Sequence, residues 1–124
     1  MLGTKIVAAG GATNSGVIGD TEGYDVSTNA WSELTPDPNP QDGSCYGALS
    51  GQLYLAGGTI TGGPLNITES FSATTNKWTA QAAMPQAVMF TGSTVANGLL
   101  YCFGGSNINT GRGTIYNNVQ IYQP

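Results

Sequence analysis

The chain has 124 residues, of which 40% are hydrophobic and only 8% are charged, and its net charge is −4. Its three cations, Lys5, Lys77 and Arg112, are too few and too scattered to neutralise a run of phosphates, which excludes nucleic acid as a partner. The same shortage argues against an anionic membrane surface, and no apolar run reaches the roughly 18 residues of a membrane span.

The first predicted element is a strand over residues 5–9 that ends in a pair of glycines. Such pairs recur with a step of 47 residues: Gly10-Gly11, Gly57-Gly58 and Gly104-Gly105. Trp31 and Trp78 keep the same step. A fixed period in this range is typical of a propeller or a solenoid. No helix follows the glycine pairs, so we interpret them as structural and not as phosphate-binding loops.

The complete repeat predicts four short strands, over residues 43–49, 52–56, 67–73 and 78–82. Ser50-Gly51 fits a tight hairpin turn, because glycine accepts a positive φ without cost. No stretch shows the 3.6-residue apolar period of a helix. Four antiparallel strands in a repeat of about 40 to 50 residues indicate a propeller blade and an all-β fold.

The motifs of these repeats resemble the kelch family. Its blade pattern is a strand ending in Gly-Gly, then Tyr-Asp, then Trp, then Met-Pro. The first copy has Tyr24-Asp25 and Trp31, the second has Phe71-Ser72, Trp78 and Met84-Pro85, and the third has Tyr122-Gln123. The resemblance implies a kelch-like β-propeller segment built of four-stranded antiparallel blades. It departs from the family at residues 88–91, where kelch blades often carry Arg-x-x-His.

The strands divide the chain into about two and a half blades. We expect residues 1–38 to hold the three outer strands of a first blade and residues 39–85 to form a complete blade. Residues 86–124 would then hold the three inner strands of a third. A propeller needs four or more blades to close. We therefore expect self-association, as a homo-oligomer, or completion by the remainder of a larger propeller.

The two cysteines and the two tryptophans have predicted structural roles. Cys45 falls on the first strand of the second blade and Cys102 on the second strand of the third. Facing sheets lie about 10 Å apart, which is too far for a disulfide, so we expect free, buried thiols. Trp31 and Trp78 should pack between blades, each with its indole N–H bonded to a local acceptor.

Catalysis has few candidate residues. The chain contains no histidine, which removes Ser-His-Asp and Cys-His arrangements and the commonest metal ligand. Asp20, Glu22, Asp25, Asp37 and Asp42 are typical of loop and turn acids. We expect no enzyme activity, no cofactor and no metal. The resemblance leaves one alternative, a fragment of a sugar-processing kelch propeller enzyme.

The longer loop of the third repeat, residues 106–118, is the best candidate for a binding surface. It carries four side chains suited to hydrogen bonding and stacking: Asn107, Asn109, Arg112 and Tyr116. The sequence thus predicts a non-catalytic binding or scaffolding module that recognises a protein or a carbohydrate through its blade-connecting loops. Low charge with abundant Asn and Thr favours an extracellular or periplasmic parent over a cytoplasmic one.

Overall fold

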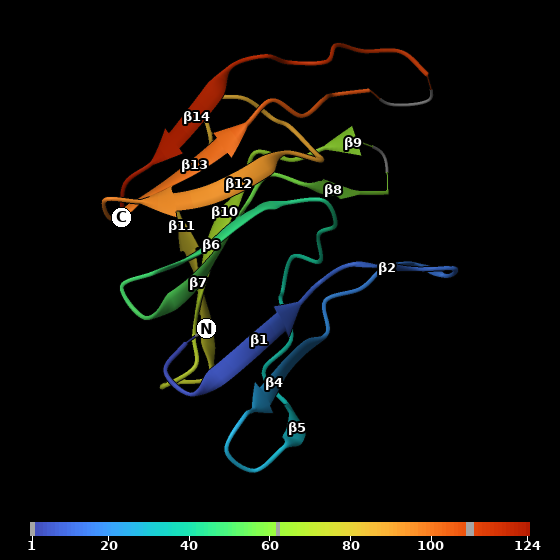
Figure 1. Ribbon diagram of the computed structural model, residues 1–124. Helices are drawn as coiled ribbons and strands as arrows, with labels where there is room; N and C mark the ends of the chain where they lie inside the picture. The colour runs from blue at the N-terminus through green and yellow to red at the C-terminus, as the bar shows by residue number, and fades with distance from the viewer. Residues whose placement is uncertain (1, 62, 109–110) are drawn as a thin grey trace.

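The computed structural model describes residues 2–61, 63–108 and 111–124. Over these residues the chain contains strands and no helix, which confirms the predicted all-β class. Three main antiparallel sheets follow one another along the chain and are fanned side by side (Figure 1). No described helix is long and apolar enough to span a membrane.

The three sheets contain three, four and three strands. The first has the order β1 (Lys5–Ala9), β4 (Thr21–Asp25), β5 (Ala30–Glu33). The second has the order β6 (Cys45–Leu49), β7 (Gln52–Ala56), β10 (Thr68–Ser72), β11 (Lys77–Gln81). The third has the order β12 (Gly92–Ala96), β13 (Leu99–Phe103), β14 (Val119–Tyr122). Consecutive strands therefore pair as neighbours, as in a propeller blade.

Two short hairpins follow the first and second glycine pairs: β2 (Ala12–Thr13) with β3 (Gly16–Val17), and β8 (Thr59–Ile60) with β9 (Gly63–Pro64). Both hairpins, and the long loop that precedes β14, project from the same side of the three sheets (Figure 1). These connections between the second and third strands of each blade thus share one side of the molecule.

The first and second strands of a blade are joined by tight turns. Ser50 and Asn97 have φ angles of 49° and 51°, and the glycine that follows each has a φ of 75°. Two consecutive positive φ angles match the right-handed twist of a hairpin. Another tight turn, with a positive φ at Gly3 alone, begins at Leu2, which exchanges backbone hydrogen bonds of 2.8 and 3.2 Å with Lys5. Leu2 thus forms an isolated bridge to β1, and the first sheet consists of β1, β4 and β5.

The glycine pairs let consecutive blades approach closely. At Gly57, a Cβ atom would lie 2.6 Å from the carbonyl oxygen of Val88, in the segment that leads to the third sheet. The next residue, Gly58, donates its N–H to that same oxygen at 2.8 Å. Both glycines have positive φ, which only glycine adopts without strain. A side chain at Gly57 would push away the segment that leads to the third sheet, and one at Gly58 would clash with the carbonyl oxygen of Asp42.

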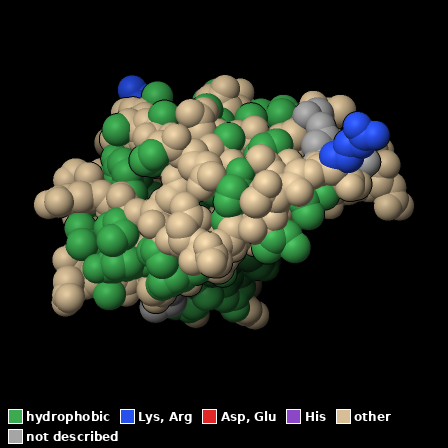
Figure 2. Space-filling model, turned by 90° about the horizontal axis from the view of Figure 1, so that it is seen from above, with side chains coloured by type: hydrophobic (Ala, Val, Ile, Leu, Met, Phe, Trp, Pro, Cys, Tyr) green, Lys and Arg blue, Asp and Glu red, His purple; other side chains and the backbone are tan. Residues whose placement is uncertain are grey.

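The second and third sheets enclose the main apolar core. It consists of Cys45, Leu49, Tyr54, Ala56, Met84, Val88, Leu100 and Cys102. Gly47 brings β6 close to the third sheet, since a Cβ there would lie only 2.9 Å from Leu100 Cδ1. The outer face of the third sheet remains exposed and carries apolar side chains such as Phe103, Val119 and Ile121. Figure 2 shows broad hydrophobic areas on the molecule viewed from this end.

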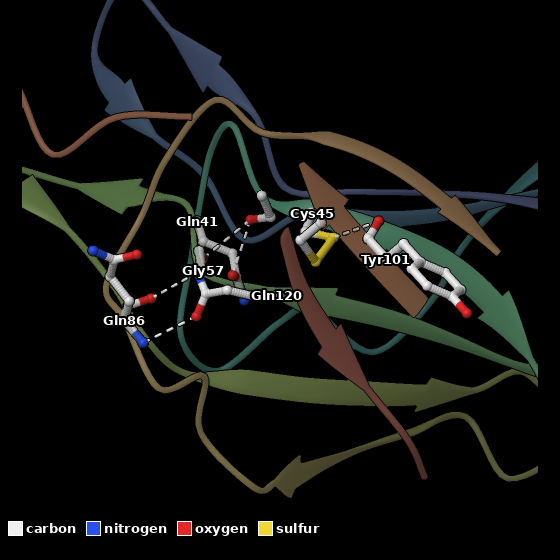
Figure 3. Close-up of a disulfide and its surroundings, with 8 residues drawn as sticks. Gln41, Cys45, Gly57, Gln86, Tyr101 and Gln120 are labelled. Atoms are coloured by element: carbon white, nitrogen blue, oxygen red, sulfur yellow. Dashed lines mark hydrogen bonds between the residues drawn. A yellow bond between two sulfur atoms is a disulfide. The ribbon is translucent and has the colours of Figure 1, made fainter. Parts of the chain in front are cut away.

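A disulfide joins Cys45 to Cys102, so the prediction of free thiols is wrong (Figure 3). The two Cα atoms lie 5.6 Å apart, within the usual range for a disulfide. The 10 Å spacing applies to large side chains packed between parallel sheet faces. Here the inner strands of neighbouring blades converge, and Gly47 removes the side chain that would hold them apart.

The two tryptophans differ in their surroundings. The Trp78 indole N–H donates to the carbonyl oxygen of Thr35, in the segment after β5, at 2.9 Å. This confirms a local acceptor and a contact between blades for Trp78. Trp31 is 58% exposed, so the expectation that it packs between blades is wrong. The first sheet presents Trp31 on a side where no described blade lies against it.

Candidate functional site

An open cleft of about 380 Å³ lies between the first and second sheets. One wall is formed by β1 and its glycine pair, and the other by β6, β7 and the segment that leads into β6. The lining residues are Val7, Ala8, Ala9, Gly10, Gly11, Gln41, Asp42, Gly43, Ser44, Tyr46, Leu53 and Leu55. Small and apolar side chains dominate, with a few polar groups, as in sites that bind ligands.

The free edge of β1 borders this cleft. On its other edge, β1 pairs with β4 along five residues, from Lys5 opposite Asp25 to Ala9 opposite Thr21. The equivalent strands β7 and β13 have both edges covered, the inner one by β6 and β12 respectively. Among described residues, only the Leu2–Lys5 bridge occupies that inner edge of β1. An edge of unpaired N–H and C=O groups is a template for another strand.

The wall opposite β1 is partly held in place by hydrogen bonds. Ser44 donates its hydroxyl to Gln41 Oε1 at 2.9 Å, and it also lies 3.3 Å from the carbonyl oxygen of Gly57. Gln41 is 2% exposed, whereas Tyr46 is 62% exposed. The cleft therefore combines two hydrogen-bonded polar residues, Gln41 and Ser44, with the exposed aromatic side chain of Tyr46, which a ligand can cover.

Behind Gln41, two carboxyl groups are buried between the first and second sheets. Asp37 and Glu69 are 4% and 3% exposed. Asn39 donates its side-chain amide to Glu69 Oε1 at 2.7 Å, and the Gln41 amide nitrogen lies 3.4 Å from a carboxyl oxygen of each acid. Burial, together with a hydrogen bond and charge repulsion from Asp37, raises the pKa of Glu69 to about 7.

Asp37 lies in a loop as predicted but is buried, whereas Glu22, also predicted as a loop acid, lies within strand β4. Asp37 accepts the backbone N–H of Asn39 at 2.8 Å and lies within the interface. Neither Asp37 nor Glu69 lines the cleft. The pair thus holds two blades together and does not face a space where a substrate binds. Within the described residues, no three acidic or cysteine side chains are grouped closely enough to hold a metal ion.

The four loop residues predicted as a binding site have different surroundings. Asn107 Oδ1 accepts the backbone N–H of Thr114, so its side chain closes the loop. Tyr116 packs against the apolar core, and Arg112 is exposed. Asn109 lies outside the described residues. Contact with a protein or glycan through these residues stays a prediction.

The residues that line the cleft were not predicted from the sequence. Only the predicted order of strands, in which the first blade has no inner strand beside β1, pointed to an opening at this place. Asp37 and Glu69 carried no such signal, because they are distant in sequence and meet only when the segment after β5 folds back over β10.

Residues 43–85, which form the second sheet and the segments on either side of it, match the Kelch motif family. A part of the chain is also 39% identical, over 50 residues, to Kelch-like protein 40 of Xenopus tropicalis. That match covers 40% of this chain and 8% of the relative's length. The resemblance inferred from the glycine pairs and tryptophans is thus confirmed for a kelch repeat.

Proposed function

We propose that this chain is a kelch-type protein-binding module that takes an extended segment of its partner along the free edge of β1. The observation that carries the proposal is this edge, which is open beyond the Leu2–Lys5 bridge and borders the cleft. Strand addition supplies affinity through backbone hydrogen bonds and specificity through alternate side chains.

The other two sheets indicate how such a segment would bind. In the second sheet, Gly47 of β6 lies opposite Tyr54, and in the third sheet Thr94 of β12 lies opposite Tyr101. Val7 occupies the corresponding position in β1. The incoming segment would run antiparallel to β1 and place a small residue opposite Val7, because Tyr46 and Leu53 border that space.

A peptide that copies residues 91–96 tests the proposal, since this segment is the natural neighbour of β13. It should slow hydrogen exchange of the β1 amides that do not bond to β4. A peptide with Trp in place of the Thr94 equivalent and one with N-methylated backbone amides serve as controls, and both should protect less. No protection at millimolar peptide, or equal protection by the N-methylated control, would overturn the proposal.

Self-association is a second way to cover the open faces, and we propose it for the exposed apolar side of the third sheet. Val119 and Ile121 are 47% and 57% exposed there. Light scattering between about 1 and 100 μM should show the mass rising above 12.7 kDa. Val119→Lys should keep the chain monomeric. A wild-type protein whose mass stays at 12.7 kDa over this range would exclude self-association through the third sheet.

The disulfide supports the proposal of an extracellular or periplasmic parent. Structural disulfides persist in oxidising compartments and are rare in the cytosol. The Cys45–Cys102 bond lies in the main core, with both residues almost fully buried. Expression in an oxidising compartment should give soluble, disulfide-bonded protein, and the yield in a reducing cytosol should be lower. Equal yields of equally stable protein would contradict an exported origin.

A further inference from the structure

Within the part of the chain that the structure describes, the acids buried at the first interface have no cation beside them. Asp37 and Glu69 are 4% and 3% exposed, and they interact by a hydrogen bond and by charge repulsion. The strands on either side of β10 place Leu55 and Ala80 opposite Glu69, and neither side chain can ionise. Two ionised carboxylates repel each other strongly in a buried space, so one of them keeps a proton while the interface is closed.

Gln41 connects these acids to the backbone of the first blade. Its side-chain amide nitrogen lies 3.4 Å from a carboxyl oxygen of each acid, and its carbonyl oxygen accepts the backbone N–H of Gly11 at 3.2 Å. Asp37 is fixed to the same blade, since its N–H donates to the carbonyl oxygen of Gly19 at 2.8 Å. A second charge that draws water to the acids would therefore disturb the contacts that hold the first blade.

The second interface has the same backbone contacts without the acids. With a step of 47 residues, Gly58 donates its N–H to the carbonyl oxygen of Val88 at 2.8 Å, and Met84 donates to that of Asn66 at 2.8 Å. Val88 and Met84 bring apolar side chains to the places that polar side chains take at the first interface. The two interfaces thus differ in whether a proton is needed to close them.

We propose that Asp37, Gln41 and Glu69 form a proton-operated latch between the first and second blades. With its proton, the Glu69 carboxyl donates a hydrogen bond to the Asp37 carboxylate, and the first blade stays docked on the second. When Glu69 releases this proton to solvent, water enters to hydrate the second charge, and the contacts through Gln41 open. The second and third sheets stay joined, because the disulfide and the apolar core do not depend on this proton.

The latch opens over the pH range in which the closed and opened states differ in protonation. Burial, together with Asp37, raises the pKa of the Glu69 carboxyl from 4.5 to about 7 in the closed state. In the opened state the hydrated carboxyl has its ordinary pKa. Opening therefore becomes easier as the pH rises from about 4.5 to about 7, and it changes no further above that.

The cleft is affected as well, because Gln41 lines it. A segment bound beside β1 would be held more tightly at pH 5 than at pH 8. This consequence rests on the proposed strand addition, whereas the latch itself needs no ligand.

Amide hydrogen exchange of the whole, disulfide-bonded chain tests the latch, with Gly11 and Gly58 as a matched pair of amides. The intrinsic rate of each amide at a given pH, divided by its measured rate, gives its protection. Protection of the Gly11 amide should fall about tenfold between pH 5 and pH 7 and level off above pH 7. Protection of the Gly58 amide should stay constant.

Two variants separate the latch from a general effect of charge. Glu69→Gln cannot ionise, so the protection of Gly11 should become independent of pH. Glu33→Gln removes a negative charge at an exposed position of β5 and should keep the wild-type profile. Equal falls at Gly11 and Gly58, or a fall at Gly11 that persists in Glu69→Gln, would overturn the proposal.

The wild-type protein supplies a second measurement that needs no variant. The side-chain carboxyl carbon resonance of Glu69 should titrate near pH 7, and titration near its ordinary value of 4.5 would overturn the latch. No peptide is present in these measurements, so failure of the latch leaves strand addition beside β1 testable, and the reverse holds too.

Discussion

The two interfaces between neighbouring sheets use equivalent positions with different chemistry. At the second interface, between the second and third sheets, Gln120 of β14 donates its amide to the Gln86 carbonyl oxygen at 3.3 Å and accepts the Gln86 backbone N–H at 3.0 Å (Figure 3). At the first interface, Glu69 takes the position of Gln120, since Glu69 lies opposite Leu55 as Gln120 lies opposite Cys102.

The neighbours of these two residues differ as well. Asp37, Asn39 and Gln41 at the first interface become Met84, Gln86 and Val88 at the second, each with a step of 47 residues. The second interface also has β12 and the disulfide, whereas the first has a cleft where an inner strand would lie. The same blade contact therefore combines amide hydrogen bonds with apolar side chains at the second interface, and it consists of buried acids and amides at the first.

The largest expected effect comes from opening the closed interface. Replacing both Cys45 and Cys102 by alanine should lower the free energy of unfolding by about 3–4 kcal/mol, because the bond closes a long loop with a sequence separation of 57. Urea denaturation of the oxidised wild type and the double variant measures this difference.

Reductant is the matched control for this prediction. It should destabilise the wild type and leave the double variant unchanged. A difference below about 1 kcal/mol would mean that the apolar core holds the second and third sheets together without the disulfide.

The tryptophan pair allows a direct comparison of a covered and an uncovered position. Trp78→Ala should cost about 2–3 kcal/mol, because it removes a half-buried ring and the hydrogen bond to Thr35. Trp31→Ala should cost less than about 1 kcal/mol, since Trp31 is largely exposed. Thermal melts of both variants in the same buffer test this. Equal losses would show that Trp31 is covered in solution.

Features that repeat along the sequence were predictable. The glycine pairs, the tight turns and the four strands of the second blade are local patterns that the period of 47 residues repeats, and the observed β6, β7, β10 and β11 lie within one or two residues of the expected ranges. Local propensity and turn chemistry suffice for such elements.

Features that depend on how two blades meet were not predictable. The disulfide forms because Gly47 lets β6 approach the third sheet, a fact about packing distance that no single strand reveals. Trp31 has the same motif as Trp78, but its exposure depends on which blade lies beside it. The cluster that joins Asp37 to Glu69 through Gln41 depends on the path of a connecting segment over a neighbouring sheet.

The smallest expected effect concerns the pH dependence of the polar interface. The pKa of the Glu69 carboxyl is raised to about 7 in the folded chain from an ordinary value of 4.5, chiefly by burial and also by Asp37. Between these two pH values the folded chain holds a proton that the unfolded chain has lost. The stabilising contribution of this proton is therefore complete below about pH 4.5, and it is lost as the pH rises through about 7.

Unfolding free energies measured from pH 4.5 to 7.5 should accordingly contain a decrease of about 1–2 kcal/mol that belongs to Glu69, allowing for partial screening by solvent. Glu69→Gln gives the first interface the amide that Gln120 supplies at the second, and it cannot ionise. This variant should flatten the profile above pH 5 and be the more stable protein at pH 7.5. Glu33→Gln, at an exposed position of β5, removes one negative charge outside the cluster and controls for net charge. If Glu69→Gln and wild type have parallel profiles, the folded chain does not hold the proton on Glu69, and the two interfaces do not differ in the way their chemistry indicates.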